Sequence, residues 1–116
     1  MLGIAGRVGV VDPAAVRILT VDSLPQPDNP ELRLAANETG LLGPGMIGLT
    51  LGYAVFIVTG HESVRLVSHE CRHVHQYESH GGISRFLPIY LGQIARFGYR
   101  NAPMEIDARN HEVNSI

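Results

Sequence analysis

The pentapeptide His69-Glu70-Cys71-Arg72-His73 constrains the fold more than any other part of this 116-residue chain. Two histidines four residues apart can bind one metal ion together when the segment is helical, because residues i and i+4 then lie on the same face of the helix. Glu70 lies one step around that helix, close to the same face. The pattern therefore predicts a helix with His69 and His73 as metal ligands and Glu70 beside the ion.

This H-E-x-x-H pattern carries the groups that a zinc hydrolase needs. Two imidazoles bind the ion, and a neighbouring carboxylate can act as a base toward a water molecule at an open coordination position. We therefore predict Zn²⁺ as the cofactor, although two imidazoles and one carboxylate also suit Fe, Mn or Co. A catalytic zinc site usually has a third protein ligand, which must come from elsewhere in the chain.

The third ligand has several candidates downstream of the motif. His75 points to nearly the opposite side of the same helix from the two motif histidines. His80 lies two helical turns, about 10 Å, beyond His73. An acidic residue on a later helix remains, and Glu105 fits this role, with Asp107 as the alternative.

The apolar pattern indicates an α+β fold with a small sheet of about three strands, followed by a helical part that carries the motif. Runs of β-branched residues predict the strands, and cap residues with helical apolar spacing predict the helices. The predicted strands cover residues 16–21, 47–51 and 53–58. The predicted helices cover residues 28–39, Ser63 to near Gly81, about Pro88 to Gly98, and Pro103 onward.

The length suits one domain spanning residues 1–116. We expect residues 1–14 to form a flexible arm or an edge strand and not a signal peptide, because no charged lead precedes a continuous apolar run. The longest apolar stretch, residues 47–58, is too short to span a bilayer. We therefore expect a cytoplasmic protein without a membrane partner.

Charge and cysteine content exclude several classes of protein. The net charge is −2, and the nine cationic residues are all arginines without any basic run, so we expect no nucleic-acid partner. The single cysteine, Cys71, excludes an internal disulfide and a cysteine-based zinc finger. Because Cys71 follows His69 by two residues, it points away from the metal side and is expected to be a small buried hydrophobic residue.

The ten residues from His69 to Glu78 read H-E-C-R-H-V-H-Q-Y-E. With Glu105 downstream, the chain resembles the gluzincins, zinc peptidases with H-E-x-x-H on one helix and a glutamate ligand on a following helix. It is similar to minimal gluzincin domains such as the ImmA/IrrE-type peptidases, and to small uncharacterised bacterial proteins with this extended string. The resemblance covers roughly residues 53–109. It implies a minimal zincin-like fold and Glu105 as the third ligand.

One position departs from the gluzincin pattern. Gluzincins commonly have an aspartate four residues after the ligand glutamate, where it hydrogen-bonds the first zinc histidine, whereas this chain has Arg109. Either Asp107 or Glu78 is then expected to support His69, or the histidine is oriented differently. Loss of such support lowers metal affinity or activity by about 10–100-fold.

Together these features predict a zinc-dependent metallopeptidase that acts on peptides or proteins, with Glu70 as the catalytic base. A zinc-binding structural or recognition module without useful turnover is the alternative, favoured by the small size and by Arg109. A third possibility is a protease that becomes active only after assembly with a partner or a second copy. The glycine-rich hairpin, residues 43–60, would be the contact surface for that assembly.

Overall fold

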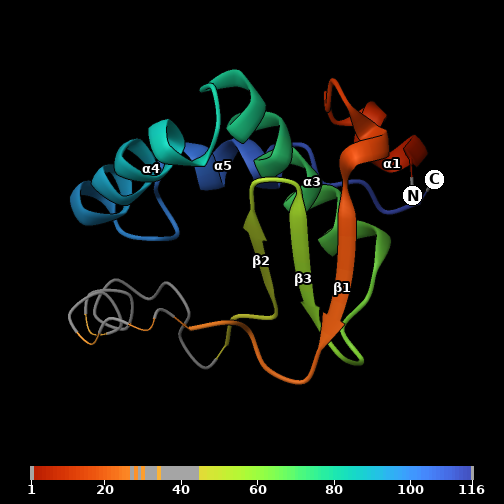
Figure 1. Cartoon of the computed structure of the whole chain (residues 1–116), viewed down its shortest axis with the longest axis horizontal. Coiled ribbons are helices and arrows are strands. Elements are labelled where there is room, and N and C mark those ends of the chain that lie inside the picture. Colours follow the sequence, from red (N-terminus) through yellow and green to blue (C-terminus); the bar gives the residue numbers. More distant parts are fainter. Residues whose placement is uncertain (1, 27, 29, 31–33, 35–44, 116) are drawn as a thin grey trace.

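Three strands form one small mixed sheet in the computed structural model, which describes residues 2–26, 28, 30, 34 and 45–115. The strands are β1 (Arg17–Val21), β2 (Gly48–Leu51) and β3 (Ala54–Val58), in the spatial order β1-β3-β2 (Figure 1). The central strand β3 runs parallel to β1 and antiparallel to β2. The predicted α+β fold and its three strands are confirmed.

Helices cover one side of this sheet and extend beyond it (Figure 1). They are α1 (Leu2–Arg7), α3 (Val64–Ser79), α4 (Ile83–Phe97) and α5 (Pro103–Asn110), with a short 3-10 turn at Pro13–Ala15. The helix predicted over residues 28–39 lies outside the described residues. In the part of the chain that the structure describes, no helix is long and apolar enough to cross a membrane.

The β2–β3 hairpin brings two small residues against the motif helix. Gly52 in its tight turn has φ 62°, a left-handed conformation that glycine adopts without strain. The register pairs Gly48 with Ile57 and Thr50 with Val55. Because side chains alternate between the two faces of a strand, positions 48 and 50 share one face, and both are buried.

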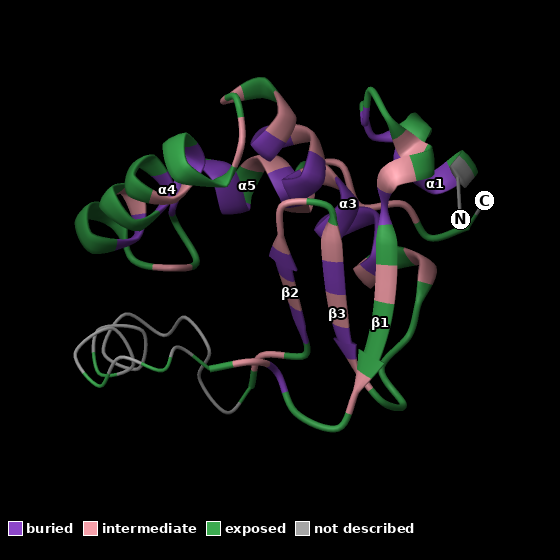
Figure 2. Ribbon diagram, in the orientation of Figure 1, coloured by how far each residue is buried: buried purple, intermediate pink, exposed green. Residues whose placement is uncertain are grey.

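The motif helix α3 begins where the sequence predicts. The Ser63 hydroxyl accepts a hydrogen bond from the Leu66 N–H at 3.0 Å, which caps the helix. Val67, Cys71 and Val74 form a buried cluster with residues of β3 and α1. Figure 2 shows this burial along α3 and at the centre of the sheet. Cys71 is fully buried in this core, as predicted.

The N-terminal segment is neither a flexible arm nor an edge strand, so the prediction for residues 1–14 was wrong. Residues Leu2–Arg7 form α1, and Ile4, Ala5 and Val8 are buried in the main core. These positions have the spacing of one helical face. The two glycines within α1 lower its helix propensity, so tertiary packing decides its conformation.

Polar side chains on the outer face of α3 hold this N-terminal segment in place. The Glu78 carboxylate accepts hydrogen bonds from the backbone N–H groups of Val11 at 2.8 Å and Asp12 at 3.0 Å. The Arg72 guanidinium donates to the Val8 carbonyl at 2.8 Å. The motif helix is therefore fixed on both its core side and its outer side.

Helix α4 begins at Ile83, five residues before the predicted start at Pro88. Proline inside a helix removes one backbone hydrogen bond, the one to the carbonyl of residue 84. Pro88 is exposed, so that carbonyl can bond to water. The predicted end at Gly98 and the start of α5 at Pro103 are confirmed.

A second buried cluster joins α4 and α5 to the C-terminal half of α3. Its members are Tyr77, Phe86, Tyr90, Ile94, Ala102 and Met104. This cluster places the first turn of α5 against α3 at the level of the H-E-x-x-H motif.

We expect Glu78→Ala to lower the free energy of unfolding by about 1–2 kcal/mol, because two backbone N–H donors of the N-terminal segment lose a charged acceptor. The Tyr53 hydroxyl, which donates to the same carboxylate at 2.7 Å, loses its partner as well. Denaturant unfolding measures the change. Glu62→Ala is the control, since the carboxylate of Glu62 accepts only a local hydrogen bond from the Gly60 N–H. Equal stability of the two variants would contradict the role of Glu78 in holding the N-terminal segment.

Candidate metal centre

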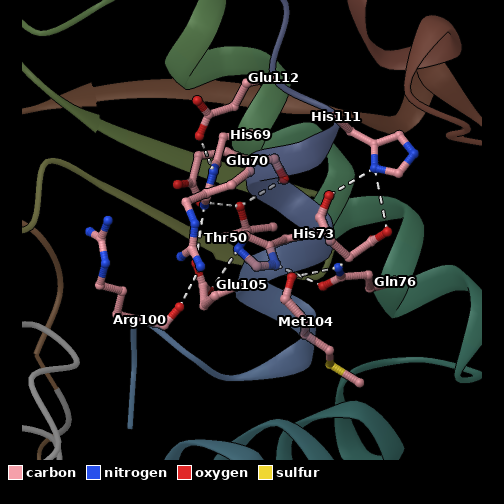
Figure 3. Close-up of polar contacts among 12 residues, drawn as sticks. Thr50, His69, Glu70, His73, Gln76, Arg100, Met104, Glu105, His111 and Glu112 are labelled. Atoms are coloured by element: carbon pink, nitrogen blue, oxygen red, sulfur yellow. Dashed lines mark hydrogen bonds and ion pairs between the residues drawn. The ribbon is translucent and has the colours of Figure 1, made fainter. Parts of the chain in front are cut away.

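Three of the predicted site residues meet at one point between α3 and α5. His69 and His73 lie one turn apart on α3, and Glu105 lies in the first turn of α5. Glu105 Oε1 is 3.1 Å from His69 Nε2, and Glu105 Oε2 is 2.9 Å from His73 Nε2 (Figure 3). All three residues are buried.

The spacing of these atoms suits a bound metal ion. With ligand bonds of 2.0–2.1 Å, two ligand atoms of a tetrahedral zinc centre lie about 3.3 Å apart. One donor atom from each of His69, His73 and Glu105 lies within 4.8 Å of the others. This buried group can therefore hold a metal ion with little movement of its side chains.

The outer nitrogen of His73 is fixed as a donor by Gln76. The Gln76 amide N–H₂ donates to the Met104 carbonyl and to Asp107 Oδ2, both at 2.9 Å, so its Oε1 must be an acceptor. His73 Nδ1 lies 2.8 Å from this oxygen and therefore carries a proton. In the neutral imidazole, the lone pair is then on Nε2, the atom that points at Glu105.

His69 has an equivalent outer partner, Glu112, which the sequence analysis missed. Glu112 Oε2 lies 2.8 Å from His69 Nδ1. Neither Asp107 nor Glu78 supports His69, because Asp107 pairs with Arg72 and Glu78 holds the N-terminal segment, so the remaining alternative, a different support for the ring, applies. Glu112 follows the end of α5, where no helical periodicity points to its position.

The carboxylate of Glu105 is the electrostatic centre of the site. Burial alone would raise the pKa of Glu105, but the hydrogen bonds from His69 and His73 outweigh burial and hold this pKa far below its usual range. The Tyr90 hydroxyl also donates to Oε2 at 2.7 Å. Glu105 therefore stays ionised and has a partner on each oxygen.

The two imidazoles are affected in the opposite direction. Burial opposes the charged form of His73, but its hydrogen bond and charge attraction to Glu105 raise its pKa to about 9. Burial likewise opposes the charged form of His69, and the Glu105 hydrogen bond again raises the pKa. Both rings therefore favour a cation at Nε2, which can be a proton or a metal ion.

Glu70 is buried beside the ligands and is held by the hairpin. Its Oε1 accepts a hydrogen bond from the Thr50 hydroxyl at 2.7 Å. A Cβ atom on Gly48 would lie only 2.9 Å from Glu70 Oε2, so a side chain there would displace the Glu70 carboxylate from this position. The Tyr77 hydroxyl donates to the Thr50 carbonyl at 3.0 Å, which ties β2 to the same helix.

An open cleft of about 750 Å³ reaches the site from outside. His69, Glu70 and Glu105 lie on its floor, and Gly48 of β2 lies on its wall. The ligand cluster is therefore buried within the protein yet accessible from one side.

The other candidate ligands are engaged elsewhere. Asp107 forms an ion pair with Arg72, with 2.8 Å between Asp107 Oδ2 and Arg72 Nε. His75 Nδ1 lies 2.8 Å from the Gly9 carbonyl, and His80 Nδ1 lies 2.8 Å from the Gln76 carbonyl. Among the described residues, only His69, His73 and Glu105 form a group able to hold an ion.

Comparison of the chain with protein-family models, curated proteins and solved structures finds no match.

We expect Glu112→Ala to weaken metal binding by about 10–100-fold, because His69 loses the partner that orients its ring. Competition with a chelating dye measures the affinity. Arg65→Ala is the control, since Arg65 contacts the same carboxylate at 3.0 Å from the solvent side and is 70% exposed. An unchanged affinity in Glu112→Ala would show that the ring is held without it.

We expect metal binding at pH 7 to release at least one proton, because a raised histidine pKa means that a proton occupies the metal-binding nitrogen. Protonation of His73 stabilises the metal-free fold below pH 6.5, and this contribution is lost as the pH rises through about 9. Metal affinity should accordingly rise between these limits. Calorimetry in buffers of different ionisation enthalpy counts the protons, and a value of zero at pH 7 would contradict the expectation.

Proposed function

We propose that the protein is a zinc-dependent metallopeptidase that hydrolyses peptide bonds with a metal-activated water. One observation carries the proposal. Two imidazoles, each with an acceptor on Nδ1, direct Nε2 at one buried carboxylate, while Glu70 lies beside them at the floor of an open cleft. A set of two histidines and one glutamate with a free position is a common ligand set of catalytic zinc.

The chain's own residues supply the acid–base step. Zinc held by His69, His73 and Glu105 would act as a Lewis acid and lower the pKa of water toward neutrality. Glu70 takes the proton of the attacking water on one carboxylate oxygen and passes it to the leaving amine. The peptide C–N bond breaks as the new C–O bond forms, so the products are a carboxylate and an amine.

Thr50 and Gly48 position Glu70 for this role. The Thr50 hydroxyl occupies Oε1, which leaves Oε2 to accept the proton. Gly48 gives Oε2 the space that any side chain would fill. Two residues of β2 therefore fix a carboxylate that α3 supplies.

The outer edge of β2 supports a peptide as the substrate. The Val58 N–H bonds the Ile47 carbonyl at 3.0 Å, and hydrogen-bonded positions alternate along an antiparallel pair, so the backbone groups of Gly48 point outward. In the part of the chain that is described, no strand pairs with this edge. An extended peptide can bind there by main-chain hydrogen bonds next to the metal ligands.

A zinc-binding structural module without turnover is the second candidate. One observation favours it: the same ligands join α5 to α3, so an ion there would also stabilise the helical part of the fold. Both candidates require the same metal content. They differ in the role of Glu70.

We expect Glu70→Gln to keep about one zinc per chain and to lower peptide hydrolysis by about 10²–10⁴-fold, because the base is lost while the ligands remain. Metal content by mass spectrometry and cleavage of a fluorogenic peptide library measure the two effects. Glu62→Gln is the matched control, being an exposed glutamate that lines the same cleft.

His73→Ala and Glu105→Ala should each lose both zinc and hydrolysis. Zinc binding by the wild type without any Glu70-dependent cleavage would support the structural module. A wild-type protein that binds no zinc even when zinc is supplied would contradict both candidates.

A further inference from the structure

We propose that Arg100 and Arg109 form a carboxylate-binding subsite in the cleft, so that the ligand of this site is a peptide carrying an acidic group. This inference rests on the proposed function, because it takes a peptide as the occupant of the cleft. It adds the chemical class of that peptide and names the cleft residues that bind its acidic group.

Both arginines line the cleft, Arg109 from α5 and Arg100 from the loop before it. Arg109 follows Glu105 by one helical turn, so the two side chains lie on the same face of α5. Arg109 donates one hydrogen bond to the carbonyl of Arg100, which links the two residues. In Figure 3 no contact is drawn to the Arg100 guanidinium.

Neither acidic residue of α5 neutralises Arg109, since Asp107 pairs with Arg72 and Glu105 is engaged at both oxygens. Glu105 Oε1 faces His69, and its Oε2 faces His73 and the Tyr90 hydroxyl, so both oxygens already have partners. Among the described residues, neither Arg100 nor Arg109 takes part in an ion pair. An arginine has five N–H donors, and within the described part of the chain Arg109 uses one of them, which leaves the others available to a ligand.

Acidic and basic residues both line the cleft. The acidic ones are Glu62, Glu70, Glu105 and Glu112, and the basic ones are Arg65, Arg100 and Arg109. Arg65 pairs with Glu112 at 3.0 Å. Among the described residues, the arginines of the cleft that have no ion-pair partner are therefore Arg100 and Arg109.

A carboxylate is the group that these two arginines fit best. Guanidinium groups bind carboxylates through paired, charge-assisted hydrogen bonds, and a peptide offers carboxylates in acidic side chains and at its C-terminus. An amidated neutral peptide offers neither. The structure assigns a carboxylate as the ligand group. The experiment identifies whether an acidic side chain or the peptide C-terminus provides it.

The test measures binding without turnover, using zinc-loaded Glu70→Gln protein and fluorescein-labelled hexapeptides. One peptide is neutral and amidated, the second has one glutamate and an amidated end, and the third is neutral with a free C-terminal carboxylate. We expect the second or the third to bind about tenfold more tightly than the first, and the better of the two identifies the source.

Variants test whether this preference belongs to the two arginines. Arg100→Gln and Arg109→Gln should each reduce the preference, and Arg100→Glu should invert it toward a peptide with one lysine. Arg85→Gln, a change of the same charge on the exposed face of α4, should leave it intact. Thermal unfolding of each variant checks that the fold is retained.

Equal binding of the three peptides, binding of none of them, or a preference that survives both arginine substitutions would overturn the subsite. Failure of the peptidase proposal has a different signature. In that case the wild type cleaves nothing, while zinc-loaded protein still binds acidic peptides through Arg100 and Arg109. Cleavage of neutral and acidic peptides at equal rates would support the peptidase and contradict the subsite.

Discussion

The structure depends on one buried negative charge, the carboxylate of Glu105. An ionised carboxylate 1% exposed is costly unless cations and donors surround it, and here two imidazoles and a tyrosine hydroxyl do so. The imidazoles use Nδ1 for outer acceptors and turn Nε2 inward. Positive charge between these three side chains is therefore stabilising. A divalent ion would supply more of it than protons on the rings do.

The motif helix links this site to the rest of the fold because each of its faces has a different task. His69 and His73 face the site, Cys71 faces the core, and Glu78 holds the segment before β1. The extended string from His69 to Glu78 is thus both a ligand set and a packing scaffold. Gln76 shows the two tasks in one residue, since its amide orients His73 while it anchors the start of α5.

The sequence predicted the parts of the fold and the site that local patterns encode. The H-E-x-x-H helix, its Ser63 cap and the hairpin follow from spacing, capping and turn chemistry, all of which act over a few residues. Helix α1 was missed because its stability comes from packing against α3 and not from its own glycine-containing sequence. Glu112 was missed because a chain turn after α5, invisible to periodicity, brings it to His69.

The positions of Glu112 and Arg109 are best understood together. Arg109 lies one turn after Glu105 on α5, and both residues line the cleft. A carboxylate at position 109 would add negative charge to a cleft that four glutamates, Glu62, Glu70, Glu105 and Glu112, already line. The partner of His69 Nδ1 is Glu112, beyond the end of the helix, so the orientation of this ring does not depend on position 109. An arginine there therefore adds positive charge to the cleft without disturbing the His69, His73 and Glu105 cluster.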